Sequence, residues 1–126
     1  MAKNLDREVD KGFDLSQWGE QMKFLHALQL QAQALIDLVQ HACSLLGLMP
    51  STYIESGKLL HAKGIFSKEE FKFYRAVVGF RNVLIHQYTS IDLKVVEKIL
   101  KAKEYRRVLM LAEKVYRELE HRGLDP

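Results

Sequence analysis

Four side chains that can take part in chemistry follow one another closely between residues 81 and 88. Arg81 and Asn82 are followed by His86 and Tyr88 in the run RNVLIHQY. Arginine is a permanently charged, planar donor that fits phosphate oxygens, and histidine takes or gives a proton near neutral pH. Asparagine can hold the imidazole or a phosphate oxygen, and tyrosine offers a hydroxyl or an aromatic face for a base. The set suits RNA cleavage by the 2′-OH of the RNA itself, which requires a base, an acid and charge stabilisation at phosphorus but no metal.

Helical spacing does not bring all four side chains to one face. Arg81 and Tyr88 would lie about 20° apart around a helix, and Asn82 and His86 would stack on the same face. Arg81 and His86 would lie about 140° apart, so one straight helix cannot hold both in a tight site. The spacing therefore predicts a composite cleft to which a second, two-fold-related copy contributes the same groups. The ordinary alternative is that Arg81 and His86 are surface or capping residues and Tyr88 a packed aromatic.

The elements that must position these residues are all predicted to be helices. Apolar residues recur at gaps of three and four from Met22 to Leu46, which predicts a long amphipathic helix ending near Gly47. Asp14 or Ser16 is its expected N-cap. Further helices are predicted at 51–60, from the capping box at 67–70 to the end of the 81–88 segment, at 93–101 and at about 104–120.

These elements predict one all-α domain over residues 1–126, an up-down bundle of four to five helices. The polar segment 1–13 is either frayed or a short helix, and 121–126 is a tail. Both long helices carry broad apolar stripes, for which one small bundle has few facing partners. A two-fold homodimer would bury the apolar helix surface that has no partner within one bundle.

Composition and charge narrow the class of protein. The chain has 126 residues, 48% of them apolar, with two prolines and one cysteine. A single cysteine excludes an internal disulfide framework and a multi-cysteine zinc site. The sequence shows no signal peptide and no run long enough to cross a membrane, so the expectation is a cytoplasmic protein without a membrane partner.

Charge is divided unevenly along the chain. Residues 1–66 carry a net charge of −1 and residues 67–126 a net charge of +4. The basic half favours a polyanion such as RNA, or an acidic protein partner, although solvated helix faces would give the same balance. The cations after the 81–88 segment are Lys94, Lys98, Lys101, Lys103, Arg106 and Arg107.

Asp37 and Cys43 are two further residues whose side chains could take part in chemistry. Asp37 lies on an apolar stripe, where it could line the cleft and orient His86 or Arg81, or remain a half-exposed helix carboxylate. Cys43 belongs to the apolar series and is expected in the core. No set of Cys, His, Asp and Glu residues has a metal-ligand spacing, so neither a metal nor a cofactor is expected.

The residues around the 81–88 segment carry a resemblance to a known family. Arg-x4-His-x-Tyr, with Asn directly after the Arg, resembles the signature of HEPN-domain proteins of the HepT type. The wider block 78–88, followed by Ile91-Asp92, is similar to the central block of that subfamily. Segments 51–55, 64–65 and 28–37 resemble it too. The resemblance covers roughly residues 20–120.

The resemblance implies a dimeric α-helical ribonuclease that is the toxin half of a toxin–antitoxin pair. Arg81 would clamp the scissile phosphate, His86 would serve in proton transfer and Asn82 would support them. The antitoxin would be an MntA-like minimal nucleotidyltransferase that transfers AMP from ATP to Tyr88. That adduct would add bulk and negative charge beside a phosphate-binding arginine.

Two alternatives to a ribonuclease remain open from the sequence. Some HEPN proteins cut nothing, and the chain could be a non-catalytic module that binds a nucleotide or a nucleotidyltransferase. A plain helical oligomerisation domain is the third possibility. The family usually opens with a well-formed first helix, whereas residues 1–13 look too short and polar for a full one, so the N-terminal packing is expected to differ.

Overall fold

The computed structural model describes residues 2–86 and 91–126, and within them it has six helices and no strand. The all-α prediction is confirmed. The helix count exceeds the expected four to five because residues 2–10, whose conformation the sequence left open, form a helix of their own. The helices are α1 (Ala2–Asp10), α2 (Trp18–Leu45), α3 (Tyr53–Ala62), α4 (Lys68–His86), α5 (Leu93–Lys101) and α6 (Arg106–His121).

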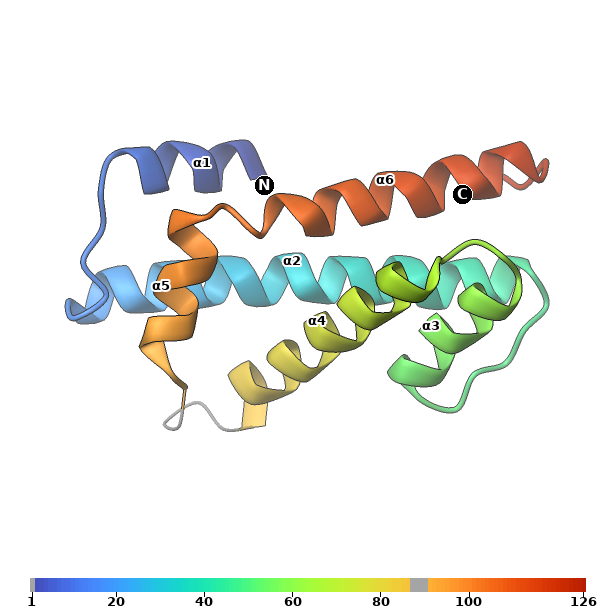
Figure 1. The fold of residues 1–126 in the computed structure, drawn as a ribbon, viewed down its shortest axis with the longest axis horizontal. Helices are drawn as coiled ribbons and strands as arrows, with labels where there is room; N and C mark the ends of the chain where they lie inside the picture. The colour runs from blue at the N-terminus through green and yellow to red at the C-terminus, as the bar shows by residue number, and fades with distance from the viewer. Residues whose placement is uncertain (1, 87–90) are drawn as a thin grey trace.

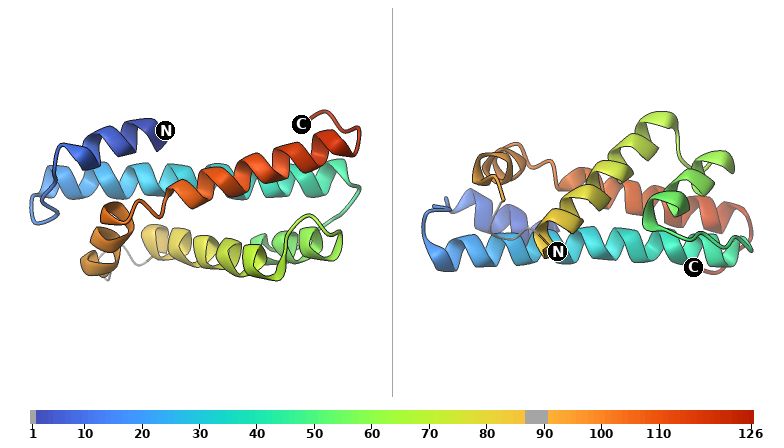
Figure 2. Two further views of the ribbon diagram at one scale, coloured as in Figure 1. Left: turned by 45° about the horizontal axis from the view of Figure 1, so that its top comes forward. Right: turned by 90° about the horizontal axis from the view of Figure 1, so that it is seen from below.

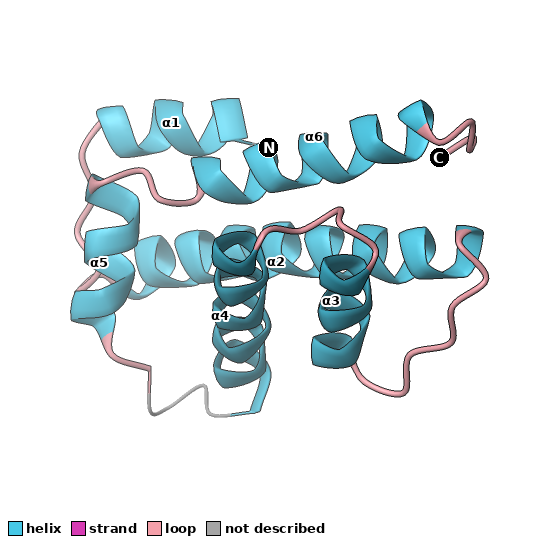
Figure 3. Ribbon diagram, turned by 45° about the vertical axis from the view of Figure 1, so that its right-hand side comes forward, coloured by secondary structure: helices cyan, strands magenta, loops and turns pink. Residues whose placement is uncertain are grey.

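The long helix α2 is the axis of the molecule (Figure 1). Helices α1 and α6 lie end to end along one side of α2, and α3 and α4 lie on another (Figure 1 and Figure 3). Helices α1 and α4 run opposite to α2, whereas α6 runs in the same direction. Helix α4 crosses α2 obliquely (Figure 2), and its last turn is packed near α5. The end of α4, which carries residues 81–86, is thus supported by α2.

Local side-chain chemistry explains where α3, α4 and α5 begin. Thr52 Oγ1 accepts a hydrogen bond from Glu55 N at 3.0 Å and caps α3. Ser67 and Glu70 form the predicted capping box, with reciprocal bonds of 3.1 and 2.8 Å. Asp92 Oδ1 accepts from Lys94 N at 2.9 Å and caps α5 as expected.

The start of α2 differs from the prediction. Its N-cap is Gln17, whose side chain makes no capping bond. Asp14 Oδ1 instead accepts from the Ser16 backbone N at 2.9 Å and from Ser16 Oγ at 2.7 Å. These bonds close a turn before the helix, so neither Asp14 nor Ser16 is left to cap it.

Two apolar clusters hold the bundle together. The larger packs the C-terminal half of α2 against α3, α4 and α6, and Ile36, Val39 and Val115 are fully buried there. The smaller gathers α1, the N-terminal half of α2, α5 and the end of α4 around Phe24 and Val96. The C-terminal part of α4, which carries the candidate site residues Arg81 and His86, therefore lies between the two apolar clusters.

Helix α1 is held by polar contacts as well as by one buried side chain, Leu5. Asp6 accepts hydrogen bonds from Arg106 and from the Tyr105 hydroxyl, and Asp10 pairs with Lys103 at 2.8 Å. Nine residues suffice for the helix because the turn before α6 supplies its partners. Among the described residues, no helix combines the length and hydropathy that a bilayer crossing requires.

Candidate functional site

Arg81 lies where α4 meets α2 and α3. Its Nε donates to Gln33 Oε1 on α2 at 2.8 Å, and its Nη1 donates to Asn82 Oδ1 at 3.1 Å. The guanidinium carbon lies 5.5 Å from the centroid of the Tyr53 ring on α3, within the range of a cation–π interaction. Three helices therefore fix the direction of one half-buried guanidinium.

All of these partners are neutral. No carboxylate in the described part of the chain forms an ion pair with Arg81. Neutral acceptors orient a guanidinium without cancelling its charge, and its remaining N–H groups suit the oxygens of an anion. The arrangement favours binding of a phosphate or a carboxylate.

Asp37 reaches Arg81 only through Gln33. It is exposed, and its Oδ1 accepts from Gln33 Nε2 at 2.8 Å, one turn along α2. Because a carboxylate only accepts and a guanidinium only donates, the two contacts set the orientation of the Gln33 amide. The sequence pointed to Asp37 and not to Gln33, although a four-residue spacing places the two on one helix face.

Tyr74, a buried residue of α4, fixes the backbone of Tyr53. Its carbonyl accepts a hydrogen bond from the Tyr74 hydroxyl at 2.9 Å. Tyr74 is fully buried, and burial raises the pKa of its hydroxyl to about 12. The Tyr74 ring packs directly against Gly57, where a Cβ would overlap it. Helices α3 and α4 thus approach closely because residue 57 has no side chain.

His86 is the last residue of α4 and is exposed, and it makes no hydrogen bond to the described residues. Arg81 belongs to the same helix, five residues earlier. Helical geometry places the two about 7.5 Å apart along the axis and about 140° apart around it. Within one copy, then, His86 does not join Gln33 and Tyr53 around the Arg81 guanidinium. Tyr88, expected to accept AMP, lies outside the described residues.

The outer face of α4 leads to His86. Lys72, Arg75, Gly79, Asn82 and His86 follow one another at three- and four-residue spacing, and all are exposed. A Cβ at Gly79 would meet nothing within 4 Å. Neither Lys72 nor Arg75 forms an ion pair within the described chain. This face is smooth at its centre and positively charged at its N-terminal end.

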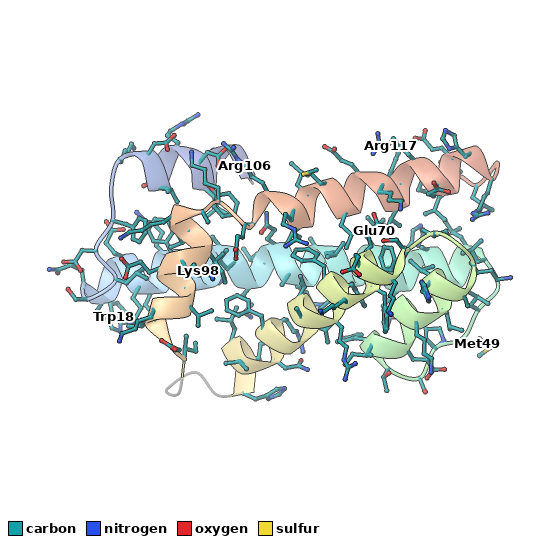
Figure 4. The ribbon with its side chains drawn as sticks, in the orientation of Figure 1. Trp18, Met49, Glu70, Lys98, Arg106 and Arg117 are labelled. Carbon is teal, nitrogen blue, oxygen red and sulfur yellow. The ribbon has the colours of Figure 1, made fainter. Side chains whose placement is uncertain are left out.

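The basic stretch after α4 is less available to a polyanion than its sequence suggests. Lys101 pairs with Glu97 at 2.5 Å, and Lys103 and Arg106 pair with the acids of α1. Figure 4 shows Arg106 at the junction of α1 and α6. Arg107 lies over the Phe73 ring at 4.3 Å. Much of this charge therefore holds the fold together.

Two other expectations concern cysteine and metal chemistry. Cys43 is buried in the larger core, its Sγ donates to the Ser56 carbonyl at 3.4 Å, and burial raises the pKa of the thiol. The expected core position of Cys43 is confirmed. Within residues 2–86 and 91–126, no group of three or more His, Cys, Asp and Glu side chains is placed to hold a metal ion.

Comparison with known proteins identifies the family. A family model described as "Ribonuclease HepT-like" matches residues 2–115, a range that runs from α1 into α6 and includes the 81–88 segment. Among the curated proteins and among the solved structures, none matches the chain significantly. The match covers most of the 126 residues, and the all-helical fold agrees with it. The chain belongs to the HepT-like ribonuclease family.

Proposed function

We propose that this protein is a metal-independent endoribonuclease toxin that cuts RNA with Arg81 and His86 in a cleft between two copies. The observation that carries the proposal is the Arg81 guanidinium, which Gln33 and Asn82 orient and which no carboxylate neutralises among the described residues. A phosphodiester is the anion that this site would take from RNA.

The reaction would use the RNA as its own nucleophile. The 2′-oxygen loses its proton and attacks the adjacent phosphorus, and the bond from phosphorus to the 5′-oxygen breaks. The 5′-oxygen takes up a proton, so the products are a 2′,3′-cyclic phosphate and a 5′-hydroxyl. Arg81 would hold the non-bridging oxygens and stabilise the charge that builds up on them. His86 would transfer a proton.

One copy offers one imidazole at this motif, whereas the reaction needs both a base and an acid. A two-fold pair of chains would supply two copies of His86 and two of Arg81 around one phosphate. The outer face of α4 suits such a pairing because Gly79 leaves the backbone open to close approach beside Asn82 and His86. Asp37 would act through Gln33 as a positioning residue.

Control of the activity is proposed from the family resemblance. Tyr88 follows His86 by two residues, and an MntA-like nucleotidyltransferase would transfer AMP from ATP to its hydroxyl. The adduct would repel the RNA backbone and obstruct the cleft. Protein made together with such a partner is expected to gain the mass of AMP and to lose activity, and Tyr88→Phe is expected to escape both effects.

The cleavage reaction is tested with protein made without a partner, whose intact mass excludes AMP, in excess EDTA. Wild type is expected to leave cyclic phosphate ends. Arg81→Ala and His86→Ala are expected to lower the rate at least about 100-fold. Arg117→Ala and His121→Ala, which remove the same groups from exposed positions on α6, serve as controls and should stay within about twofold of wild type.

Two outcomes would contradict the proposal. If unmodified wild type cuts no RNA, the non-catalytic HEPN module becomes the better account. If Arg81→Ala and His86→Ala cut as fast as the two control variants, the catalytic assignment is wrong.

A further inference from the structure

A cavity of about 290 Å³ lies on the flank of α4, between α2, α5 and the start of α6. Its size is at the lower end of the range for small-ligand pockets, about 300–1,000 Å³. Its walls are almost entirely apolar, and three aromatic rings line it: Phe73, Phe80 and Tyr105. Phe80 directly precedes Arg81 in the sequence, but helical geometry turns their side chains about 100° apart, so the cavity and the Arg81 site lie on different flanks of α4.

One polar side chain in the wall has no partner. Gln31 is only 8% exposed and lines the cavity, yet it forms no hydrogen bond to any described residue. A carboxamide has two N–H donors and an acceptor oxygen, and those of Gln31 are open to solvent or to a ligand, because none is among the fully buried polar atoms without a partner. Gln33, two residues away, has its amide fully used by Asp37 and Arg81. Gln31 thus suits an occupant that offers a donor and an acceptor side by side.

Charge further limits the occupant. Glu104 is the one charged residue lining the cavity, and it takes part in none of the ion pairs of the described chain. A carboxylate repels a phosphate and accepts a hydrogen bond from an amino group. The occupant is therefore a flat, largely apolar ring with an exocyclic amino group beside a ring acceptor, which describes adenine and cytosine, and adenine, the larger of the two, has more apolar surface to bury in the cavity.

We propose that this cavity binds an adenine base of the RNA substrate. Gln31 would pair with the N6 amino group and a neighbouring ring nitrogen, and Glu104 would accept the second N6 hydrogen. Phe73 and Phe80 would lie against the base, as aromatic side chains do for unstacked bases in single-stranded RNA. The proposal rests on the proposed function, because RNA is the molecule that would bring the base to the site.

The test uses adenosine and the full-length protein, and it requires no cleavage. Methyl NMR signals of Val95, Ile99 and Ala32, which line the cavity, are followed during titrations with adenosine, guanosine, cytidine and uridine. Adenosine is expected to shift these signals saturably and to bind at least about tenfold more tightly than the other three. Gln31→Leu is expected to weaken adenosine binding about tenfold or more, the effect of losing a bidentate base contact.

Two further variants separate a bound base from a general loss of structure. Ala76→Leu adds a side chain at an exposed position on the rim and is expected to block adenosine without unfolding the protein. Gln29→Leu makes the same change as Gln31→Leu at a position that does not line the cavity, so it should bind adenosine like wild type.

Two results would overturn the proposal: no saturable shift with adenosine, or equal binding by Gln31→Leu and wild type. RNA cleavage without adenosine binding would refute only the base pocket. Adenosine binding by a protein that cuts no RNA would refute only the proposed function.

Discussion

Arg81 owes its direction to Gln33, a residue whose chemistry alone would not mark it for a functional role. The Gln33 amide receives the guanidinium with its oxygen and gives its N–H to Asp37. The residue therefore orients the cation while leaving its charge free for a substrate. A substitution that keeps the shape of Gln33 and changes its charge separates these two effects.

Gln33→Glu is expected to raise the KM for RNA about tenfold or more, because a carboxylate 2.8 Å from Arg81 would compete with the phosphate. The fold should persist, since the new acid has a cationic partner. Gln29→Glu adds the same charge on α2 and serves as the control. Steady-state kinetics on one RNA give the comparison, and an unchanged KM for Gln33→Glu would show that Arg81 does not bind the phosphate.

Sequence reasoning could propose Arg81, Asn82 and His86 because the three lie within six consecutive residues of one helix. It could not identify Gln33 or Tyr53 as their support, because both come from other helices and meet Arg81 only after packing. Asp37 was named as a residue that would orient Arg81 or His86, and the contact it makes is with Gln33.

Tyr74 gives a pH-dependent test of the support beneath Tyr53. Burial raises the pKa of its hydroxyl from 10.0 to about 12, so the folded state favours the neutral form. The stabilisation from this group is complete below pH 10 and is lost as the pH rises toward 12. Urea unfolding of wild type is expected to show falling stability in this window, with a weaker fall in Tyr74→Phe. Equal slopes for the two proteins would contradict the assignment.

At the scale of helices, two glycines have opposite surroundings. Gly57 lies where α3 packs on Tyr74, and Gly79 lies on the open face of α4. The same substitution at the two positions should therefore change stability in opposite directions.

Gly57→Ala is expected to lower the free energy of unfolding by about 1–3 kcal/mol, because the new Cβ collides with the buried Tyr74 ring. Gly79→Ala is expected to raise it by about 0.5–1 kcal/mol, because alanine favours a helix and its Cβ meets nothing. Thermal unfolding of dilute protein measures both. A loss of stability in Gly79→Ala under these conditions would show that the open face is already covered within one chain.

Helix positions were more predictable than helix starts. The periodicity of α2 and the capping box of α4 are local signals, and both were correct. The start of α2 was not predictable because the carboxylate of Asp14, a good capping residue, accepts hydrogen bonds from Ser16 instead. Helix α1 was left undecided because the partners that hold it, Tyr105 and Arg106, are a hundred residues away.

Over the whole molecule, the attachment of α1 joins the N-terminal helix to the start of α6, about a hundred residues later in the chain. Hydrogen bonds from Arg106 and Tyr105 lower the pKa of Asp6 below its ordinary value of 3.8. The contribution of this carboxylate is present above that value and is lost as the pH falls through the lowered pKa. The packing of α1 should therefore weaken in acid before the larger core opens.

Asp6→Asn is expected to speed amide hydrogen exchange in α1 at neutral pH while exchange in α2 and α4 stays slow, because only α1 depends on the contact. Glu113→Gln, which removes an exposed acid of α6 that has no ion-pair partner in the described chain, is the control. Unchanged exchange in α1 would show that the helix is held without the Asp6 contacts, by Leu5 and by the ion pairs of Asp10 with Lys103 and of Glu8 with Lys23.

The proposed function requires two copies of the chain to build one nuclease site. The double variant Arg81→Ala/His86→Ala keeps the fold and removes both groups from one copy. When it is mixed with wild type and the subunits exchange, any mixed pair lacks the groups that one side must contribute. A site completed by both copies and a site complete within one copy then give different activities.

RNA cleavage by this mixture, in excess EDTA and with AMP-free protein, is the measurement that distinguishes a site shared by two copies from a site within one copy. An equimolar mixture is expected to keep about a quarter of the activity of wild type at the same total concentration, because only pairs of two wild-type copies cut. An activity of about a half would show that each copy works alone and would contradict the composite site. Wild-type protein that leaves RNA intact would contradict the nuclease assignment itself.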